Sequence, residues 1–417
     1  MVTPPGLDET SSRRGDRKPL RGSVGGAVCT ESVNNERLYE DPEAWALALD
    51  PKSKVGSRHH VVPRFLLEKW ADKRGQVQVR SKADSSMYSQ HVKDLGITDF
   101  YTVVSSTGEL DASMEEIFAV IEGEASVVIR ALMDPFNPLQ RVTVDQAASL
   151  ANFVALQMVR GPRRRREFEI QADWYGKTMT AGEVRKHIEE AELHEYEFVP
   201  HQNKHIKVMG SAAEAMALNI IGRPIALLTL DRPLFFIGDE PVIVNTDGDH
   251  VEHHPDCFMS DEEYEVKLER ERRRKGRHRR LVGRVVHMAP TQPRGVNKAL
   301  ELVIPITPRT LLIWSQDQGK WSGVIERIRI SGDEADEVAQ HANAHQVEWA
   351  LDTIVTRIGD KRLADLTLPD PKPLMTVCDG SGAARDAVNT VPTRIRPRRL
   401  DKSAETLAQA AQAGRTR

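Results

Sequence analysis

The sequence predicts an α+β protein: a mixed or antiparallel sheet packed with long helices, and disordered polar tails at both ends. Three observations support this class. Helical and strand-like stretches each come in runs, whereas a doubly wound sheet would alternate them. Pro and Gly separate the strand-like stretches. Both ends of the chain lack apolar periodicity, so they cannot bury enough surface to offset the entropy lost on ordering.

The composition narrows the class of protein further. Of 417 residues, 40% are hydrophobic and 29% are charged, and the net charge is −3, so no overall field attracts nucleic acid or membrane. The three cysteines lie far apart, which argues against a disulfide scaffold or an all-cysteine zinc site. No secretory segment and no apolar run of about 20 residues occurs. We therefore expect a cytoplasmic protein without a membrane span.

Composition also divides the chain into three segments. Residues 1–55 are rich in Gly, Ser, Arg, Asp and Glu, and we expect them to be disordered. Residues 56–362 contain the apolar periodicity and form the predicted folded domain. Residues 363–417 carry clustered prolines and the basic stretch Arg394–Arg399, and are predicted to be a flexible tail rich in Pro and Arg.

The first half of the domain predicts one strand and two long helices. Gln76–Arg80 alternates polar and apolar residues, as a half-buried strand does. Ala112–Met133 places its apolar residues at the three- and four-residue spacing of one buried helix face. A second helix is expected from Thr143, where Gln146 completes a capping box, to Arg160, which precedes a Gly-Pro pair.

The second half predicts the rest of the sheet and a last helix from about Asp333 to Arg357. The strand-like stretches are Ile225–Leu230, Leu234–Ile237, Val242–Asn245, Leu302–Ile306 and Leu311–Trp314.

Five short motifs follow one another along the domain: His59–Leu67, the acidic helix stretch Met114–Glu122, the Gln-x-x-Arg helix end Gln157–Pro162, the Asp-x-Pro turn Gly238–Val242, and Asn343 in the last helix. Their order and spacing resemble the domain of unknown function 4238 family over roughly residues 58–360. Because no activity is established for that family, the resemblance implies a fold and a set of positions more than a reaction.

The chain departs from the family pattern in three places. His59 stands where members often have Gln, and Val61 stands where they often have an aromatic residue. The Arg-rich stretch near 272–280 is particular to this chain.

Three candidate residues carry groups suited to acid–base work. His60 has the side chain that titrates near neutral pH and binds metals most often, or it simply pins the first strand or turn by a hydrogen bond. Glu115 and Glu122 are seven residues apart and share a helix face, where paired carboxylates hold a cation such as Mg²⁺ or divide acid and base roles. The alternative for both is a solvated face near a helix start.

Gln157 and Arg160 form the most informative pair. Gln157 lies on or beside the apolar face of its helix, and Arg160 follows one turn later, so both need polar partners. Together they can grip a carboxylate or a phosphate. An internal ion pair of Arg160 with Glu122 or Asp239 explains them equally well.

Asp239 and Asn343 complete the candidates. Asp239 lies between two strand-like stretches, where it is either a turn former or a carboxylate at a strand end. Asn343 is a candidate through the family resemblance alone. The segment His250–Cys257 holds ligand types that suit Zn²⁺, but its spacing fits no zinc motif and we do not expect a site there.

Two basic clusters, Arg163–Arg166 and Arg272–Arg280, are candidate contacts for a nucleic-acid backbone. The second has no interleaved aromatic residues, and its acidic neighbour Asp261–Glu265 is able to neutralise it, so a solvated helix surface also fits. Nucleotide-binding loops of the GxxxxGK[ST] or GxGxxG type and a GxSxG elbow are absent. These absences argue against common ATPases, dinucleotide enzymes and α/β-hydrolases, and both the cofactor and a metal requirement stay open.

Two functions and one structural role remain as hypotheses. The first is a metal-dependent hydrolase of the nuclease or phosphoesterase type, and the second is a non-catalytic module that binds nucleic acid or protein. The third is a scaffold in which the polar residues form a buried network only. In the hydrolase, the site residues are His60, Glu115, Glu122, Gln157, Arg160, Asp239 and Asn343.

Overall fold

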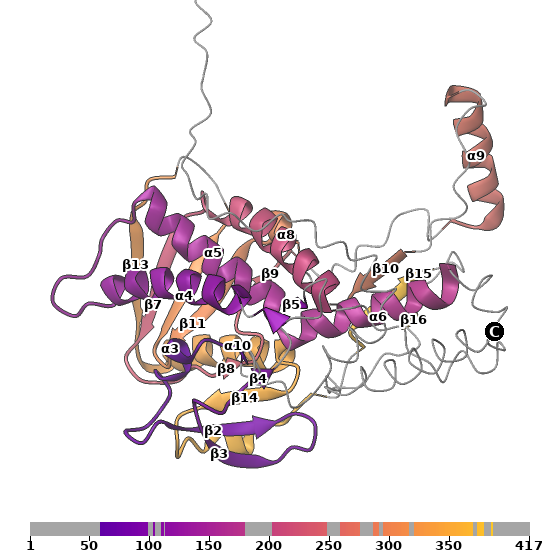
Figure 1. The fold of residues 1–417 in the computed structure, drawn as a ribbon. Helices are drawn as coiled ribbons and strands as arrows, with labels where there is room; N and C mark the ends of the chain where they lie inside the picture. Colours follow the sequence, from indigo (N-terminus) through magenta and orange to yellow (C-terminus); the bar gives the residue numbers. More distant parts are fainter. Residues whose placement is uncertain are drawn as a thin grey trace, which may run out of the picture.

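The computed structural model describes residues 59–98, 103–104, 110–111, 113–179, 202–247, 259–275, 287–291, 295–316, 321–369, 373–378 and 385–386. Its architecture is α+β, as predicted, with mixed and antiparallel sheets and long helices (Figure 1). The expected disordered segment 1–55 lies outside the described residues. No helix among those that are described is both long and apolar enough to cross a membrane.

A five-stranded mixed sheet forms the centre of the main core. Its order is β13-β7-β12-β11-β9, in which β13 and β7 run parallel and the other neighbours run antiparallel. Its middle strands are continuous apolar stretches, as expected of strands that are covered on both faces. The strands are β7 (Ile225–Leu230), β9 (Ile243–Asn245), β11 (Glu301–Thr307), β12 (Thr310–Ser315) and β13 (Ile325–Ile330).

Three helices pack on this sheet and on one another (Figure 1): α4 (Ser113–Leu132), α5 (Val144–Arg160) and α8 (Gln202–Ile220). The capping box predicted for α5 is present, because Gln146 N donates to Thr143 Oγ1 and Thr143 N donates to Gln146 Oε1. Eleven residues of α5 are buried, so this helix lies at the middle of the helical layer.

A second, antiparallel sheet of four strands has the order β3-β2-β14-β8. The strands are β2 (Gln76–Ser81), β3 (Met87–His91), β8 (Ile237–Gly238) and β14 (Thr353–Thr356). Helix α10 (Gly332–Trp349) contacts β8 of this sheet and β9 of the five-stranded sheet, and so joins the two. Its small buried residues allow this close approach: Ala335, Ala339 and Ala342.

A third layer is built on α6 (Pro162–Met179), which begins directly after α5. Ile170 of α6 packs against a three-stranded sheet of order β10-β15-β16. The bounds of these strands are His287–Pro290, Met375–Cys378 and Arg385–Asp386. The last two strands fall inside the segment 363–417, for which a flexible tail is expected.

The remaining elements are short, apart from α9. In Figure 1, α9 stands away from the sheets at the edge of the molecule. The bounds are β1 (His59–His60), α3 (Arg64–Leu67), β4 (Ile97–Thr98), β5 (Val103–Val104), β6 (Leu110–Asp111), α9 (Asp261–Lys275), the 3₁₀ helix η3 (Val296–Lys298) and α11 (Arg362–Asp365).

Two element predictions need correction. The last helix ends at Trp349 instead of continuing to Arg357, because residues 353–356 turn into β14 and pair with β2. Of the stretch Leu234–Ile237, only the last residue enters a strand. In the preceding residues, side chains and the Pro308 carbonyl take the place of a strand partner. The local periodicity of the sequence reveals neither the early end of the helix nor the loss of the strand partner.

Candidate functional site

A buried guanidinium lies where α5 ends against α4. Arg160 Nη1 donates to Glu122 Oε1 at 2.6 Å, and the Arg160 guanidinium lies 5.8 Å from the centre of the Phe118 ring. The Arg160 side chain is 1% exposed, whereas Glu122 keeps 24% of its side chain in contact with solvent. The cluster therefore combines a buried cation with a carboxylate that solvent reaches, and it selects Glu122 from the two predicted partners of Arg160.

Gln157 belongs to the same cluster. In the amide orientation that satisfies both groups, its oxygen accepts from Arg160 Nε at 3.1 Å and from Nη2 at 2.9 Å. Glu115, Phe118 and Glu122 follow helical spacing along α4, so Glu115 lies on the face of α4 that meets Arg160. Four of the predicted site residues thus gather along one helix–helix contact.

Helix α6 brings further charges into the interior, and the sequence did not predict them. Arg163, Arg165 and Arg166 are buried, and Glu169 pairs with Arg165 at 3.2 Å and with Arg166 at 3.1 Å. Because Arg163, Arg165 and Arg166 are buried and only Arg164 keeps a substantial part of its side chain (31%) exposed, the cluster Arg163–Arg166 presents little basic surface. The sequence suggested these four arginines as contacts for a nucleic-acid backbone, and only the tertiary fold reveals that three of them are buried.

A buried histidine of α8 lies beside this helix. The His205 ring meets the Phe168 ring edge-on, with ring centres 5.2 Å apart. Burial, together with the charges of Arg165 and Arg164, lowers the pKa of His205 to about 3. The imidazole is therefore neutral at physiological pH and adds no further positive charge to the interior.

Glu240 joins the start of α6 to the Asp-x-Pro turn. Its carboxylate accepts from Arg163 N at 2.6 Å, so it acts as an acceptor for the first turn of α6. A side chain at Gly161 would fill the same space, since a Cβ there would lie 2.2 Å from the Glu240 carboxylate oxygens. The Gly161 backbone has φ −62°, so the glycine is needed for space and not for an unusual conformation.

Asp239 holds the chain that leaves α10. Its carboxylate accepts three backbone hydrogen bonds, from Leu351 N at 2.8 Å, Asp352 N at 2.7 Å and Thr353 N at 3.1 Å. Burial raises the pKa of the Asp239 carboxyl, while these three donors and the nearby Lys82 ammonium act in the opposite direction. Both oxygens are engaged with backbone, which assigns Asp239 a bonding role in the fold.

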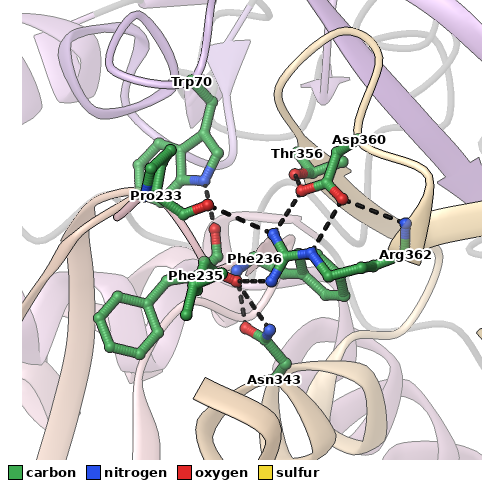
Figure 2. A network of polar contacts seen from close by, with 9 residues as sticks. Trp70, Pro233, Phe235, Phe236, Asn343, Thr356, Asp360 and Arg362 are labelled. Atoms are coloured by element: carbon green, nitrogen blue, oxygen red, sulfur yellow. Dashed lines mark hydrogen bonds and ion pairs between the residues drawn. The ribbon is translucent and has the colours of Figure 1, made fainter. Parts of the chain in front are cut away.

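Asn343 is likewise engaged with backbone. Its side-chain oxygen accepts from Phe236 N at 2.7 Å, and its amide donates to Leu234 O at 2.9 Å. Figure 2 shows the same strand-like segment held by Trp70 and by Arg362, which donates to Leu234 O at 2.9 Å. Side chains thus satisfy backbone groups that a neighbouring strand would otherwise satisfy.

Gln346 extends this arrangement by one turn of α10. It accepts from Gly238 N at 2.7 Å and donates to Pro241 O at 2.9 Å. We call Asp239, Asn343 and Gln346 the backbone clamp. The Asn-x-x-Gln spacing in the sequence would have suggested that Gln346 shares the role of Asn343.

Two cations cover the carbonyl end of α10. Lys82 Nζ donates to Val347 O at 2.7 Å and to Ala350 O at 2.6 Å, and Arg163 Nε donates to Trp349 O at 3.0 Å. Cations at this end of a helix are favoured by its dipole and by the unpaired carbonyls of the last turn.

The buried ammonium group of Lys82 leads to a prediction of how the stability of the fold depends on pH. Burial lowers its pKa from 10.5 to about 8, with Arg163 acting in the same direction and Asp239, Glu348 and Asp352 opposing it. Below that pH both folded and unfolded chains hold the proton, and the cost of burial is fully present. Between about 8 and 10.5 the unfolded chain binds more protons, so the contribution of Lys82 to stability rises with pH.

We expect the free energy of unfolding of the natural chain, relative to Lys82→Met, to rise by on the order of 1–3 kcal/mol from about pH 7 to about pH 10. Urea unfolding of both chains at a series of pH values measures this difference. A difference that stays flat or falls over that range would contradict the assignment.

His60 has a local polar contact. Its Nε2 lies 3.2 Å from the Lys93 carbonyl oxygen, and β1, to which it belongs, pairs with β4. This contact matches the interpretation that the histidine pins the first strand. Its part in catalysis stays a prediction.

Most of the candidates therefore fall into two neighbouring groups. Glu122 and Gln157 each contact Arg160, whereas Asp239 and Asn343 belong to the backbone clamp. The two groups adjoin, because Glu240 follows Asp239 and bonds the backbone only three residues beyond Arg160. Across the part of the chain that the structure describes, no three His, Cys, Asp or Glu side chains are grouped so as to hold a metal ion.

The fold and the site define an α+β domain whose interior carries several charged side chains in ion pairs, without the motif of a known cofactor. Residues 58–266, about half of the chain, match the family described as "Protein of unknown function (DUF4238)", and the chain belongs to this family. Neither the curated proteins nor the solved structures contain a match. The His250–Cys257 segment lies outside the described residues.

Proposed function

We propose that the domain is a hydrolase of phosphate esters, of the nuclease or phosphoesterase type, with its site at the contact of α4 and α5. One observation carries the proposal: the guanidinium of Arg160, buried and bonded to Gln157, faces Glu122, whose side chain is 24% exposed. Arg and Gln side chains grip phosphate oxygens in this kind of pairing. A carboxylate that solvent reaches is able to exchange protons.

In this proposal, Glu122 and Glu115 share the acid–base work or hold a divalent cation. Mg²⁺ is commonly bound by one or two carboxylates together with substrate phosphates. The two glutamates on one face of α4 suit this limited ligand set better than a cage of protein ligands. Arg160 and Gln157 would orient the phosphate and stabilise the charge that develops on it.

Asp239 and Asn343 act in this proposal by maintaining the fold around the site. Their side-chain hydrogen bonds go to backbone groups, and through Glu240 the same turn fixes the start of α6 beside Arg160. His60 keeps its predicted role as base or metal ligand in this proposal.

We expect Glu122→Gln to lower the rate of phosphodiester hydrolysis by about 10²- to 10⁴-fold, the usual contribution of a positioned acid or base. The assay uses the full chain with Mg²⁺ or Mn²⁺, on bis(4-nitrophenyl) phosphate and on single-stranded oligonucleotides. Glu68→Gln is the matched control. Glu68 also accepts a hydrogen bond from an arginine one helical turn away, Arg64, at 2.8 Å, but its side chain is 47% exposed and it is not part of the proposed site. The control should retain full activity.

Arg160→Lys is the second variant, since it keeps the positive charge and loses the planar grip. Circular dichroism verifies that each variant is folded. Absence of hydrolysis by the natural chain with every metal and substrate would refute the proposal. Equal losses in Glu122→Gln and Glu68→Gln would show that the effect is not specific to the site.

The second candidate function, a module that binds nucleic acid or protein without catalysis, is favoured by one observation. Helix α9 stands away from the body in Figure 1, and the Arg273 side chain on it is 80% exposed. The helix holds six acidic and six basic residues, however, and Arg273 pairs with Glu269 at 3.2 Å. Salt-sensitive binding by a chain that cleaves no ester would favour this function over hydrolysis.

A further inference from the structure

A pair of histidines on α10 faces away from the backbone clamp. His341 and His345 are four residues apart, and their Nε2 atoms lie 3.2 Å from each other. The rings are nearly perpendicular, with an interplanar angle of 79° and centres 4.5 Å apart. His341 is exposed and His345 is half-buried, so both residues are at least partly in contact with solvent.

This separation is the one that two imidazole ligands of a single metal ion require. Zinc–nitrogen bonds of about 2.0–2.1 Å at a tetrahedral angle place the two nitrogens roughly 3.3 Å apart. Two neutral imidazoles that meet through Nε2 share one proton between them, because one ring must donate and the other accept. A metal ion replaces that proton and binds both nitrogens.

We propose that His341 and His345 form a surface site for a divalent metal ion of the copper, nickel and zinc group. The two imidazoles supply the protein ligands, and water completes the coordination, which leaves open positions on the ion. The charge near the site is suited to a cation, since Glu348 acts electrostatically on His345 from the next turn of the helix. This site is separate from the α4–α5 cluster and does not depend on the hydrolase proposal.

Binding there has a structural consequence. The opposite, buried side of α10 carries Asn343 and Gln346 of the backbone clamp. A metal that joins positions four apart holds one turn of the helix closed, and a ligand that binds only the folded state stabilises it. We therefore expect the metal to raise the melting temperature of the whole domain.

The test is isothermal titration of the full, tag-free chain with NiCl₂, CuCl₂ and ZnCl₂, combined with thermal melts. We expect affinity to decrease in the order Cu²⁺, Ni²⁺, Zn²⁺. His341→Gln and His345→Gln should each weaken binding at this site at least about tenfold, because only one ligand remains and the chelate is lost. The metal-dependent rise in melting temperature should disappear in both.

Ala344→Gln is the control, since it adds a polar side chain at an exposed position between the two histidines and leaves both imidazoles in place. This variant should bind as the natural chain does. The stoichiometry distinguishes this site from binding to other histidines, including those in the segment His250–Cys257. Each His variant should lose one equivalent of bound metal. Unchanged stoichiometry and affinity in both His variants, or no binding by the natural chain, would overturn the proposal.

Discussion

Replacing Asp239 with alanine is expected to lower the free energy of unfolding by about 3–5 kcal/mol, one of the largest effects of any single change in this chain. The substitution removes the acceptor for the amides of residues 351–353 in a partly buried turn, and each donor left unpaired there is costly. It also leaves Lys82 without the carboxylate that favours its charged form. Urea unfolding at neutral pH measures the loss.

Asp72→Ala provides the matched control for this prediction. Asp72 also accepts two backbone hydrogen bonds, from Arg74 N at 2.8 Å and Gln76 N at 2.9 Å, but it does so at the surface, where water replaces them. Asp72→Ala should therefore have a clearly smaller effect. If both variants lost a similar amount of unfolding free energy, the hydrogen bonds of Asp239 would stabilise the fold no more than those of a surface aspartate.

Gly161→Ala is expected to lower the free energy of unfolding by about 2–3 kcal/mol. The new Cβ would overlap the Glu240 carboxylate, which is buried and has little room to move, and the first turn of α6 would lose its acceptor. Thermal or urea unfolding measures the change.

The control variant for this prediction, Gly123→Ala, is expected to change the free energy of unfolding in the opposite direction. Gly123 lies inside α4, and a Cβ there would meet no atom within 4 Å. Gly123→Ala should raise the free energy of unfolding by about 0.5–1 kcal/mol, as expected when alanine replaces glycine within a helix. A Gly161→Ala variant that is as stable as the natural chain, or more stable, would contradict the contact between Gly161 and Glu240.

Local sequence signals were sufficient for elements that are held by their own periodicity and caps. The strand from Ile225 to Leu230 and the helix capped by Thr143 have the predicted bounds, because apolar spacing and capping depend on near neighbours. Helix α6 was missed, since the Gly-Pro pair that stops α5 also starts the next helix, with Pro162 at its first position.

The candidate site was predictable only in part. Glu122 and Arg160 are joined through two helices whose faces the sequence reveals, so their pairing was among the expected alternatives. The partners of Asp239 lie more than a hundred residues away along the chain, and no local signal identifies them. The carboxylate of Glu240 was overlooked because Glu-Pro in a turn resembles ordinary loop composition.

The central claim is a division of roles: the clamp residue Asp239 maintains the fold, whereas Glu122 in the adjoining cluster performs the chemistry. Measuring both stability and hydrolysis per folded molecule in Glu122→Gln and Asp239→Ala tests it most directly. We predict that Glu122→Gln stays folded and loses activity, while Asp239→Ala unfolds more easily and is active when folded at low temperature. A stable but inactive Asp239→Ala with a fully active Glu122→Gln would contradict the account.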